Sequence, residues 1–169
     1  MKTLTILFIL FTTIFADDYK YHTKKVEITN QLYLEECASC HMAYQSQFLP
    51  KRSWNKMMDN LATHFGVDAT FTKEDEKTIR EYLLNNASDS TNGYGYYSKF
   101  ARSISSMDTP IAISEIPKFK REHREIPKRF ISQKGVKTIS NCIACHKDAK
   151  KGLYKERNIF IPNYGRWDD

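Results

Sequence analysis

The chain has 169 residues, of which 41% are hydrophobic, and basic side chains outnumber acidic ones by 26 to 20, which gives a formal net charge of +6. This length suits one medium domain or two small ones, and a small domain needs help in building a core. No arrangement of aromatic and basic residues typical of an RNA- or DNA-binding module occurs, so the basic balance does not indicate a nucleic-acid partner.

The first 16 residues have the pattern of a secretory signal peptide. Lys2 gives a positive start, an apolar run extends from Leu4 to Phe15, and Ala16 precedes two aspartates. Cleavage after Ala16 fits this pattern, and the apolar run is short for a membrane-spanning helix. We therefore expect an exported, periplasmic protein with a cleaved N-terminal signal peptide; a retained signal anchor is the alternative.

All four cysteines fall in two pentapeptides of one pattern, CASCH at residues 37–41 and CIACH at residues 142–146. A CxxC pair alone is also compatible with a zinc site, a local disulfide or a thioredoxin-like redox pair. None of these explains the histidine after each pair, whereas CxxCH is the signature of covalent haem c attachment, with that histidine as the proximal iron ligand. The sequence therefore predicts two haem c groups and no zinc. The covalent attachment residues are Cys37, Cys40, Cys142 and Cys145, and the proximal ligands are His41 and His146.

Helical periodicity marks the region between the two motifs. A helix fits around residues 30–40, and apolar residues recur at helical spacing over residues 53–65, with Ser53 as the expected N-cap and Gly66 as the stop. His64 falls at the edge of the apolar face of this second helix. We therefore expect His64 to be presented by a helix of about three turns.

Further helices are predicted towards the C-terminus. Thr72 is expected to cap a helix that ends before Asn86. Pro117 suits the first turn of a short helix over residues 116–124, and Asn141 is a plausible cap for residues 141–146. No stretch alternates convincingly as a strand, so the predicted fold class is all-α, mainly helical with long loops.

A segment rich in turn-forming residues, 88–98, separates the two motifs. Each side of it then contains one CxxCH motif. We predict an N-terminal haem c domain over residues 17–90 and a C-terminal haem c domain over residues 91–169.

Each iron needs a sixth ligand, and three histidines remain after the proximal pair: His22, His64 and His123. His64 lies 23 residues after His41, and His123 lies 19 residues before Cys142 on a short helix bounded by prolines. We predict that His64 serves the first haem and His123 the second as distal ligands. A histidine on an apolar face is otherwise an ordinary core residue, and His22 is expected to be a surface residue near the mature N-terminus.

Methionine is the alternative sixth ligand and would raise the reduction potential. Met57 and Met58 lie in the same periodic segment as His64, where such residues are more often part of the core, and Met107 lies in a turn-like segment. The expected state is therefore two bis-histidine, low-spin haems of low potential.

As a whole, the chain resembles the dihaem cytochromes c of bacterial periplasms, often called DHC. The resemblance covers nearly all of the mature chain and rests on ECASCHMAY at 36–44, Leu49-Pro50 followed by Ser53-Trp54, Leu61 with His64-Phe65-Gly66, Asp68-Ala69, Phe119, Arg121-Glu122-His123, NCIACH at 141–146, and Ile161-Pro162. It implies a two-domain helical protein whose first domain is similar to class I cytochromes c, with a histidine in place of the usual methionine ligand. It also implies electron transfer with redox proteins, such as a monohaem cytochrome c or a membrane cytochrome b of the b561 type.

Three functions are compatible with two haems. The function that we expect is electron transfer through irons whose six coordination positions are all filled. The protein is then an electron carrier and not an enzyme. A small haem peroxidase needs an open iron and distal acid–base residues, and a haem-based ligand sensor needs a displaceable ligand. The chain departs from the family in its basic segment from Lys147 to Arg157, which we expect to steer docking with an acidic partner unless it is simply a solvated face.

Overall fold

The computed structural model describes residues 26–93 and 97–167. The predicted signal peptide at residues 1–16 and His22 lie outside these ranges. Within them, no helix has the length and apolar character needed to cross a membrane.

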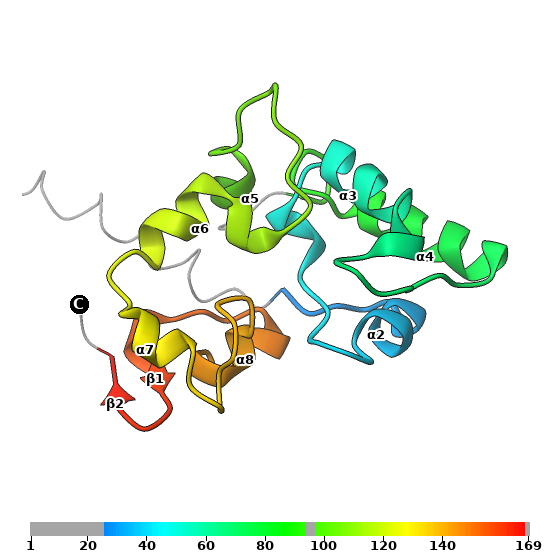
Figure 1. Cartoon of the computed structure of the whole chain (residues 1–169). Helices are drawn as coiled ribbons and strands as arrows, with labels where there is room; N and C mark the ends of the chain where they lie inside the picture. Colours follow the sequence, from blue (N-terminus) through cyan, green and yellow to red (C-terminus); the bar gives the residue numbers. More distant parts are fainter. Residues whose placement is uncertain (1–25, 94–96, 168–169) are drawn as a thin grey trace, which may run out of the picture.

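Short helices joined by long loops make up most of the fold (Figure 1). In chain order the elements are α2 (Gln31–Cys37), η1 (Ser46–Phe48), α3 (Lys51–Met58), η2 (Leu61–Thr63), α4 (Lys73–Asn85), α5 (Ser98–Ala101), η3 (Ile113–Glu115), α6 (Pro117–Glu122), α7 (Lys128–Ile131), α8 (Cys142–Cys145), η4 (Ala149–Lys151), η5 (Glu156–Asn158), β1 (Phe160–Ile161) and β2 (Gly165–Arg166). The prediction of a mainly helical fold is confirmed.

One hydrophobic core runs through both halves of the sequence. Helix α4 packs against α3 and α2, and α5 packs against α6 and η1. Leu49, Ile79 and Leu83 are fully buried in this core together with Ile116, which lies beyond the predicted boundary at 88–98. The two predicted domains therefore share core residues, and independent folding of each half stays a prediction.

The predicted helix over 53–65 is wrong in its bounds. Helix α3 begins directly after Pro50, whose carbonyl oxygen accepts hydrogen bonds from the amides of Ser53 and Trp54, so Ser53 lies inside the helix and not at its N-cap. The helix ends at Met58, and the Asn60 side-chain amide donates to the Lys56 carbonyl oxygen (2.7 Å). A polar side chain that binds a helix carbonyl in this way competes with continued helix.

His64 consequently lies in a turn and not on a helix. The His64 carbonyl oxygen accepts from the Val67 amide (3.0 Å), and the two residues between them have left-handed backbones, with φ of 48° at Phe65 and 91° at Gly66. These are the features of a type I′ turn, which favours glycine at one of its central positions. The glycine predicted as a helix stop therefore makes the turn that presents His64.

The cap at Thr72 is confirmed, and two other local predictions are confirmed in part. The Thr72 hydroxyl accepts from the Asp75 amide (3.2 Å), and α4 ends with Asn86 as its C-cap. Pro117 occupies the first turn of α6, which ends earlier than predicted, with His123 as the C-cap residue. Asn141 precedes α8, but its side chain donates to the Val136 carbonyl oxygen instead of capping the helix.

One small element was missed. Strands β1 and β2 pair antiparallel, with Phe160 opposite Arg166 and Ile161 opposite Gly165. Strands of two residues are too short to show alternation in the sequence. The all-α prediction therefore needs correction by one hairpin, which buries Ile161.

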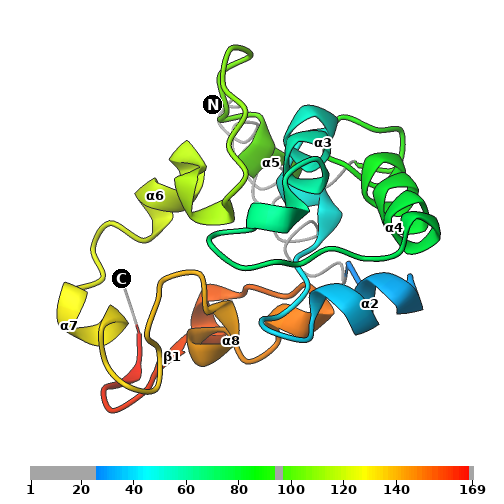
Figure 2. The same ribbon diagram turned by 45° about the vertical axis from the view of Figure 1, so that its right-hand side comes forward.

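Residues far apart in sequence join the first motif region to the second. In Figures 1 and 2 the segment around α8 lies beside the loop that follows α2. The Tyr44 hydroxyl donates to the Ser140 carbonyl oxygen (2.8 Å), and the fully buried Gln45 amide donates to the Ala149 carbonyl oxygen (3.0 Å). Gln45 also accepts from the Tyr154 hydroxyl (2.8 Å). A single buried side chain thus satisfies two polar groups of the C-terminal half.

The first prediction concerns the cap of α4. Thr72→Ala should lower the free energy of unfolding by about 1 kcal/mol, because the Asp75 amide loses its acceptor. Thr78→Ala is the matched control, since Thr78 is exposed in the middle of the same helix and alanine favours helix there. Denaturant unfolding of the haem-loaded protein measures both; equal destabilisation by the two variants would contradict the cap assignment.

The second prediction concerns Gln45. Gln45→Leu should lower the free energy of unfolding by about 1–3 kcal/mol, because the Ala149 carbonyl and the Tyr154 hydroxyl lose their partner in a buried place. Gln31→Leu, at an exposed position of α2, serves as the control and should change stability little. If Gln45→Leu unfolds at the parent's denaturant midpoint, Gln45 does not hold the halves together.

Candidate haem sites

The structure brings the four histidines of the described residues together as two pairs. The ring centres of His41 and His64 are 6.2 Å apart, and those of His123 and His146 are also 6.2 Å apart. Each pair joins a histidine of a CxxCH motif to one of the histidines predicted as a distal ligand. The pairing follows the predicted assignment, His64 with the first motif and His123 with the second.

This spacing fits one metal ion between two imidazoles. Metal–imidazole nitrogen bonds are about 2 Å long and a ring nitrogen lies about 1.2 Å from its ring centre, so two imidazoles on opposite sides of one ion have centres about 6.4 Å apart. If the rings simply packed against each other, the two pairs would have no reason to share the same distance between ring centres. The residues therefore fit an axially coordinated iron at both places.

In each pair one ring has its Nδ1–H engaged by a backbone carbonyl. His41 donates to the Met42 carbonyl oxygen (2.8 Å), and His123 donates to the Phe119 carbonyl oxygen (2.8 Å). A hydrogen bond at Nδ1 fixes the tautomer in which Nε2 carries the lone pair. Both rings thus have Nε2 free to bind a metal.

Burial favours the neutral form of His64, His123 and His146. It lowers the pKa of His123, and it lowers the pKa of His146 to about 4, with the nearby His123 adding to that effect. The pKa of His64 is lowered first by burial and then by His41. Neutral imidazole is the form that binds iron, so the sites favour ligation at neutral pH.

The four cysteines differ in burial. All four are free, with Cys142 buried and Cys40 exposed. Burial raises the pKa of Cys37 to about 12, with the Glu36 carboxylate adding to the rise, and burial raises the pKa of Cys142 to about 11. A raised pKa disfavours the thiolate of Cys37 and Cys142.

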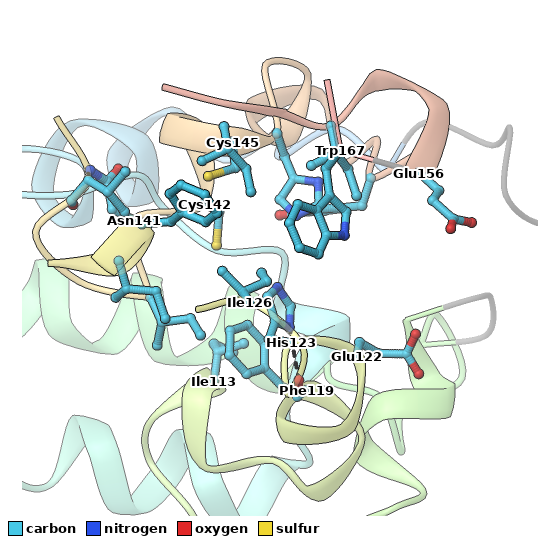
Figure 3. Close-up of a pocket in the computed structure, with 18 of the residues that line it drawn as sticks. Ile113, Phe119, Glu122, His123, Ile126, Asn141, Cys142, Cys145, Glu156 and Trp167 are labelled. Atoms are coloured by element: carbon cyan, nitrogen blue, oxygen red, sulfur yellow. Dashed lines mark hydrogen bonds between the residues drawn. The ribbon is translucent and has the colours of Figure 1, made fainter. Parts of the chain in front are cut away.

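A cavity of about 420 Å³ lies at the second motif. Figure 3 shows Cys142 and Cys145 on one wall and His123, with Phe119, on the opposite wall. Most of the other lining side chains are apolar, among them Phe100, Ile113, Ile126 and Trp167 of the second half, and Phe48 comes from the first half. A large apolar cavity with a few placed polar groups is typical of a cofactor site.

The surroundings of the first motif are more open. Cys40 and His41 are exposed, and Phe65 and Val67, on either side of Gly66, are 62% and 56% exposed. The two histidine pairs therefore have the same spacing in different environments, one open to solvent and one enclosed.

Two aromatic side chains near the proximal histidines were missed by sequence reasoning. The Tyr44 ring lies 5.2 Å from the His41 ring, and the Tyr154 ring lies 5.3 Å from the His146 ring. Tyr44 is three residues from His41, which is a usable signal, but Tyr154 is brought back to His146 by the turn at η4. The methionine alternatives Met57 and Met58 lie on α3, where Met58 is buried in the core.

Comparison with known proteins agrees with this geometry. The family model described as dihaem cytochrome c matches residues 33–154. No curated protein sequence matches the chain.

Solved structures of dihaem cytochromes c are similar over most of the chain. A dihaem cytochrome c from Rhodobacter sphaeroides is 41% identical, with a TM-score of 0.68, over 76% of this chain and 99% of that one. A dihaem cytochrome c from Shewanella baltica is 35% identical, with a TM-score of 0.66, over 82% of this chain and 98% of that one. The chain therefore belongs to the dihaem cytochrome c family, whose members carry two covalently bound haem c groups with iron.

Proposed function

We propose that the protein is a periplasmic electron carrier that uses two bis-histidine, low-potential haems. The observation that carries the proposal is the repeated 6.2 Å spacing of a motif histidine and a second histidine. Cys37 and Cys40 attach the first haem and Cys142 and Cys145 the second. His41 and His64 are the axial ligands of the first iron, and His146 and His123 those of the second.

The protein's residues hold each iron in one coordination state. When bound, haem iron supplies reversible one-electron redox chemistry. His41 with His64, and His146 with His123, would hold the two irons, and imidazole favours the ferric state more than a methionine thioether does. This supports low potentials, and it leaves no open position of the kind that a peroxidase or a ligand sensor needs.

Charged residues beside the second cavity suit the haem propionates. Lys155 and Arg157 line the cavity together with Glu122 and Glu156. The two cations are suited to pair with propionate carboxylates. Part of the basic segment would then serve the cofactor, and the rest would be available to a partner.

Export and domain organisation complete the proposal. Attachment of haem c outside the cytoplasm is consistent with the predicted signal peptide at residues 1–16. Each of the segments 17–90 and 91–169 contains one CxxCH motif and both histidines of one pair. This supports one haem domain per segment, the first similar to class I cytochromes c.

The distal ligands provide the test of the proposed function. His64→Gly and His123→Gly should each open one iron, so that the reduced protein binds carbon monoxide at one haem and not at the other. His22→Gln is the control and should leave both haems six-coordinate. Absorption spectra with and without carbon monoxide measure this. An unchanged spectrum in either glycine variant would remove that histidine from the ligand set.

The proposed partners are redox proteins with an acidic face, such as a monohaem cytochrome c or a membrane cytochrome b of the b561 type. Exposed lysines follow the second attachment motif closely: Lys147 lies over the Phe160 ring (4.5 Å), and Lys151 pairs with Asp148 (3.0 Å). A residue within a few positions of His146 lies near the second haem. Lysines there would speed encounter with an acidic partner.

Charge reversal tests this docking face. The double variant Lys147→Glu, Lys150→Glu should slow electron exchange with a small acidic cytochrome c at low salt, and the difference from the parent should shrink as ionic strength rises. Lys73→Glu, Lys77→Glu on α4 makes an equal charge change on another element and is the control. Stopped-flow rates measure both variants. If the two doubles are slowed equally, only net charge matters and this face is not the docking site.

A further inference from the structure

The two histidine pairs differ in the angle between their rings. The planes of His41 and His64 are 29° apart, whereas those of His123 and His146 are 70° apart. The spacing is the same, so the difference comes from what holds each ring. This inference rests on the proposed bis-histidine ligation and extends it to the electronic state of each iron.

Two contacts fix the ring of His123. Its Nδ1–H donates to the Phe119 carbonyl oxygen (2.8 Å), and the Phe119 ring stacks on the imidazole with centres 4.0 Å apart and planes 15° apart (Figure 3). Phe119 itself is buried in the core. His123 therefore cannot rotate about its own axis without breaking a hydrogen bond and a stacking contact.

His146 lacks the hydrogen bond that usually orients a ligand histidine. Its Nδ1 is buried and has no hydrogen-bond partner among the described residues. The backbone of His146 is fixed by hydrogen bonding. Its amide donates to the Cys142 carbonyl oxygen (2.7 Å), and the residue forms an isolated antiparallel β-bridge with Ile159. A metal-binding histidine normally donates its other N–H to an acceptor, which fixes the plane of the ring. The plane of His146 is therefore set by packing.

His146 also has an aromatic contact with Tyr154. The two rings meet edge to face, with centres 5.3 Å apart and planes 64° apart. Tyr154 is held at both ends: its hydroxyl donates to the buried Gln45 (2.8 Å), and its ring packs against Phe48 and Tyr97, each 5.6 Å away, in a cluster in which those two rings are 5.0 Å apart. Because the His146 Nδ1 makes no hydrogen bond within the described part of the chain, contact with the Tyr154 ring is the constraint that sets the orientation of the His146 imidazole.

We propose that Tyr154 is a positioning residue that holds the His146 imidazole crosswise to His123, and that the second haem is thereby electronically distinct from the first. Aligned imidazoles donate π density into one iron d orbital and raise it above its partner. Crossed imidazoles donate into both orbitals, which become nearly equal in energy. Alignment stabilises the ferric state, so crossing the rings raises the potential of the second haem above that of the first.

Enclosure acts in the same direction. The second site lies in an apolar cavity, whereas His41 and Cys40 of the first site are exposed. Burial away from water disfavours the more highly charged ferric iron and is one means by which proteins tune haem potential. Electrons that enter at the open first haem would therefore collect at the enclosed second one.

Electron paramagnetic resonance of the oxidised, haem-loaded protein tests the ring angles directly. Aligned rings give an ordinary rhombic low-spin signal, and crossed rings give a highly anisotropic low-spin signal with a large maximum g value. We expect one signal of each kind in equal amount. Two rhombic signals would overturn the inference while leaving bis-histidine ligation intact. A high-spin or histidine–methionine signal would overturn the ligation itself.

Variants at position 154 test the residue. Tyr154→Leu and Tyr154→Met should each shift the anisotropic signal towards the rhombic form and lower the potential of the second haem. Tyr154→Phe keeps the ring packed against Phe48 and Tyr97 and should retain both properties. Tyr82→Leu is the control, since Tyr82 is half-buried on α4 with its ring against Tyr33. If every loaded variant keeps the parent's two signals and potentials, Tyr154 does not position His146.

Discussion

Two imidazole rings 6.2 Å apart, one from a CxxCH motif and one from a distant turn or helix end, occur once in each half of the chain. The fold must therefore position both histidines of a pair, the motif histidine and the distal one. The motif side is local, because the histidine directly follows the second cysteine: Cys37 ends α2 with Cys40 in the turn after it, and α8 carries both Cys142 and Cys145. The distal side depends on tertiary structure: a type I′ turn presents His64, and the end of α6 presents His123. Most of the fold positions these two segments opposite the motifs.

The two sites are packed into one structure. Met42, next to the first proximal histidine, is buried against Cys142 of the second motif, and Tyr44 and Tyr154 pack around them. The cavity at the second motif also includes Phe48 from the first half. Loss of one haem is thus expected to loosen the other site.

The sequence predicted what is encoded locally. Both attachment motifs and the cap at Thr72 depend on residues within one turn of each other. The cap is confirmed, and the two haem c groups that the motifs predict are those of the family. The predicted end of α3 is wrong, because the apolar periodicity continues to Phe65 while the backbone leaves the helix at Met58. His64 was predicted on a helix for the same reason. Its pairing with His41 was predicted because only three histidines remained for two irons.

The contacts that orient the proximal rings could not be predicted. Gln45 and Tyr154 are 109 positions apart, and neither has a pattern around it that marks a buried polar pair. The missing partner of the His146 Nδ1 is a property of packing alone. Near-infrared magnetic circular dichroism of the oxidised protein tests the central claim most directly, since the energy of its charge-transfer band identifies the axial ligands of low-spin ferric haem. The account predicts histidine–histidine bands from both irons, and a histidine–methionine or high-spin band from either iron would contradict it.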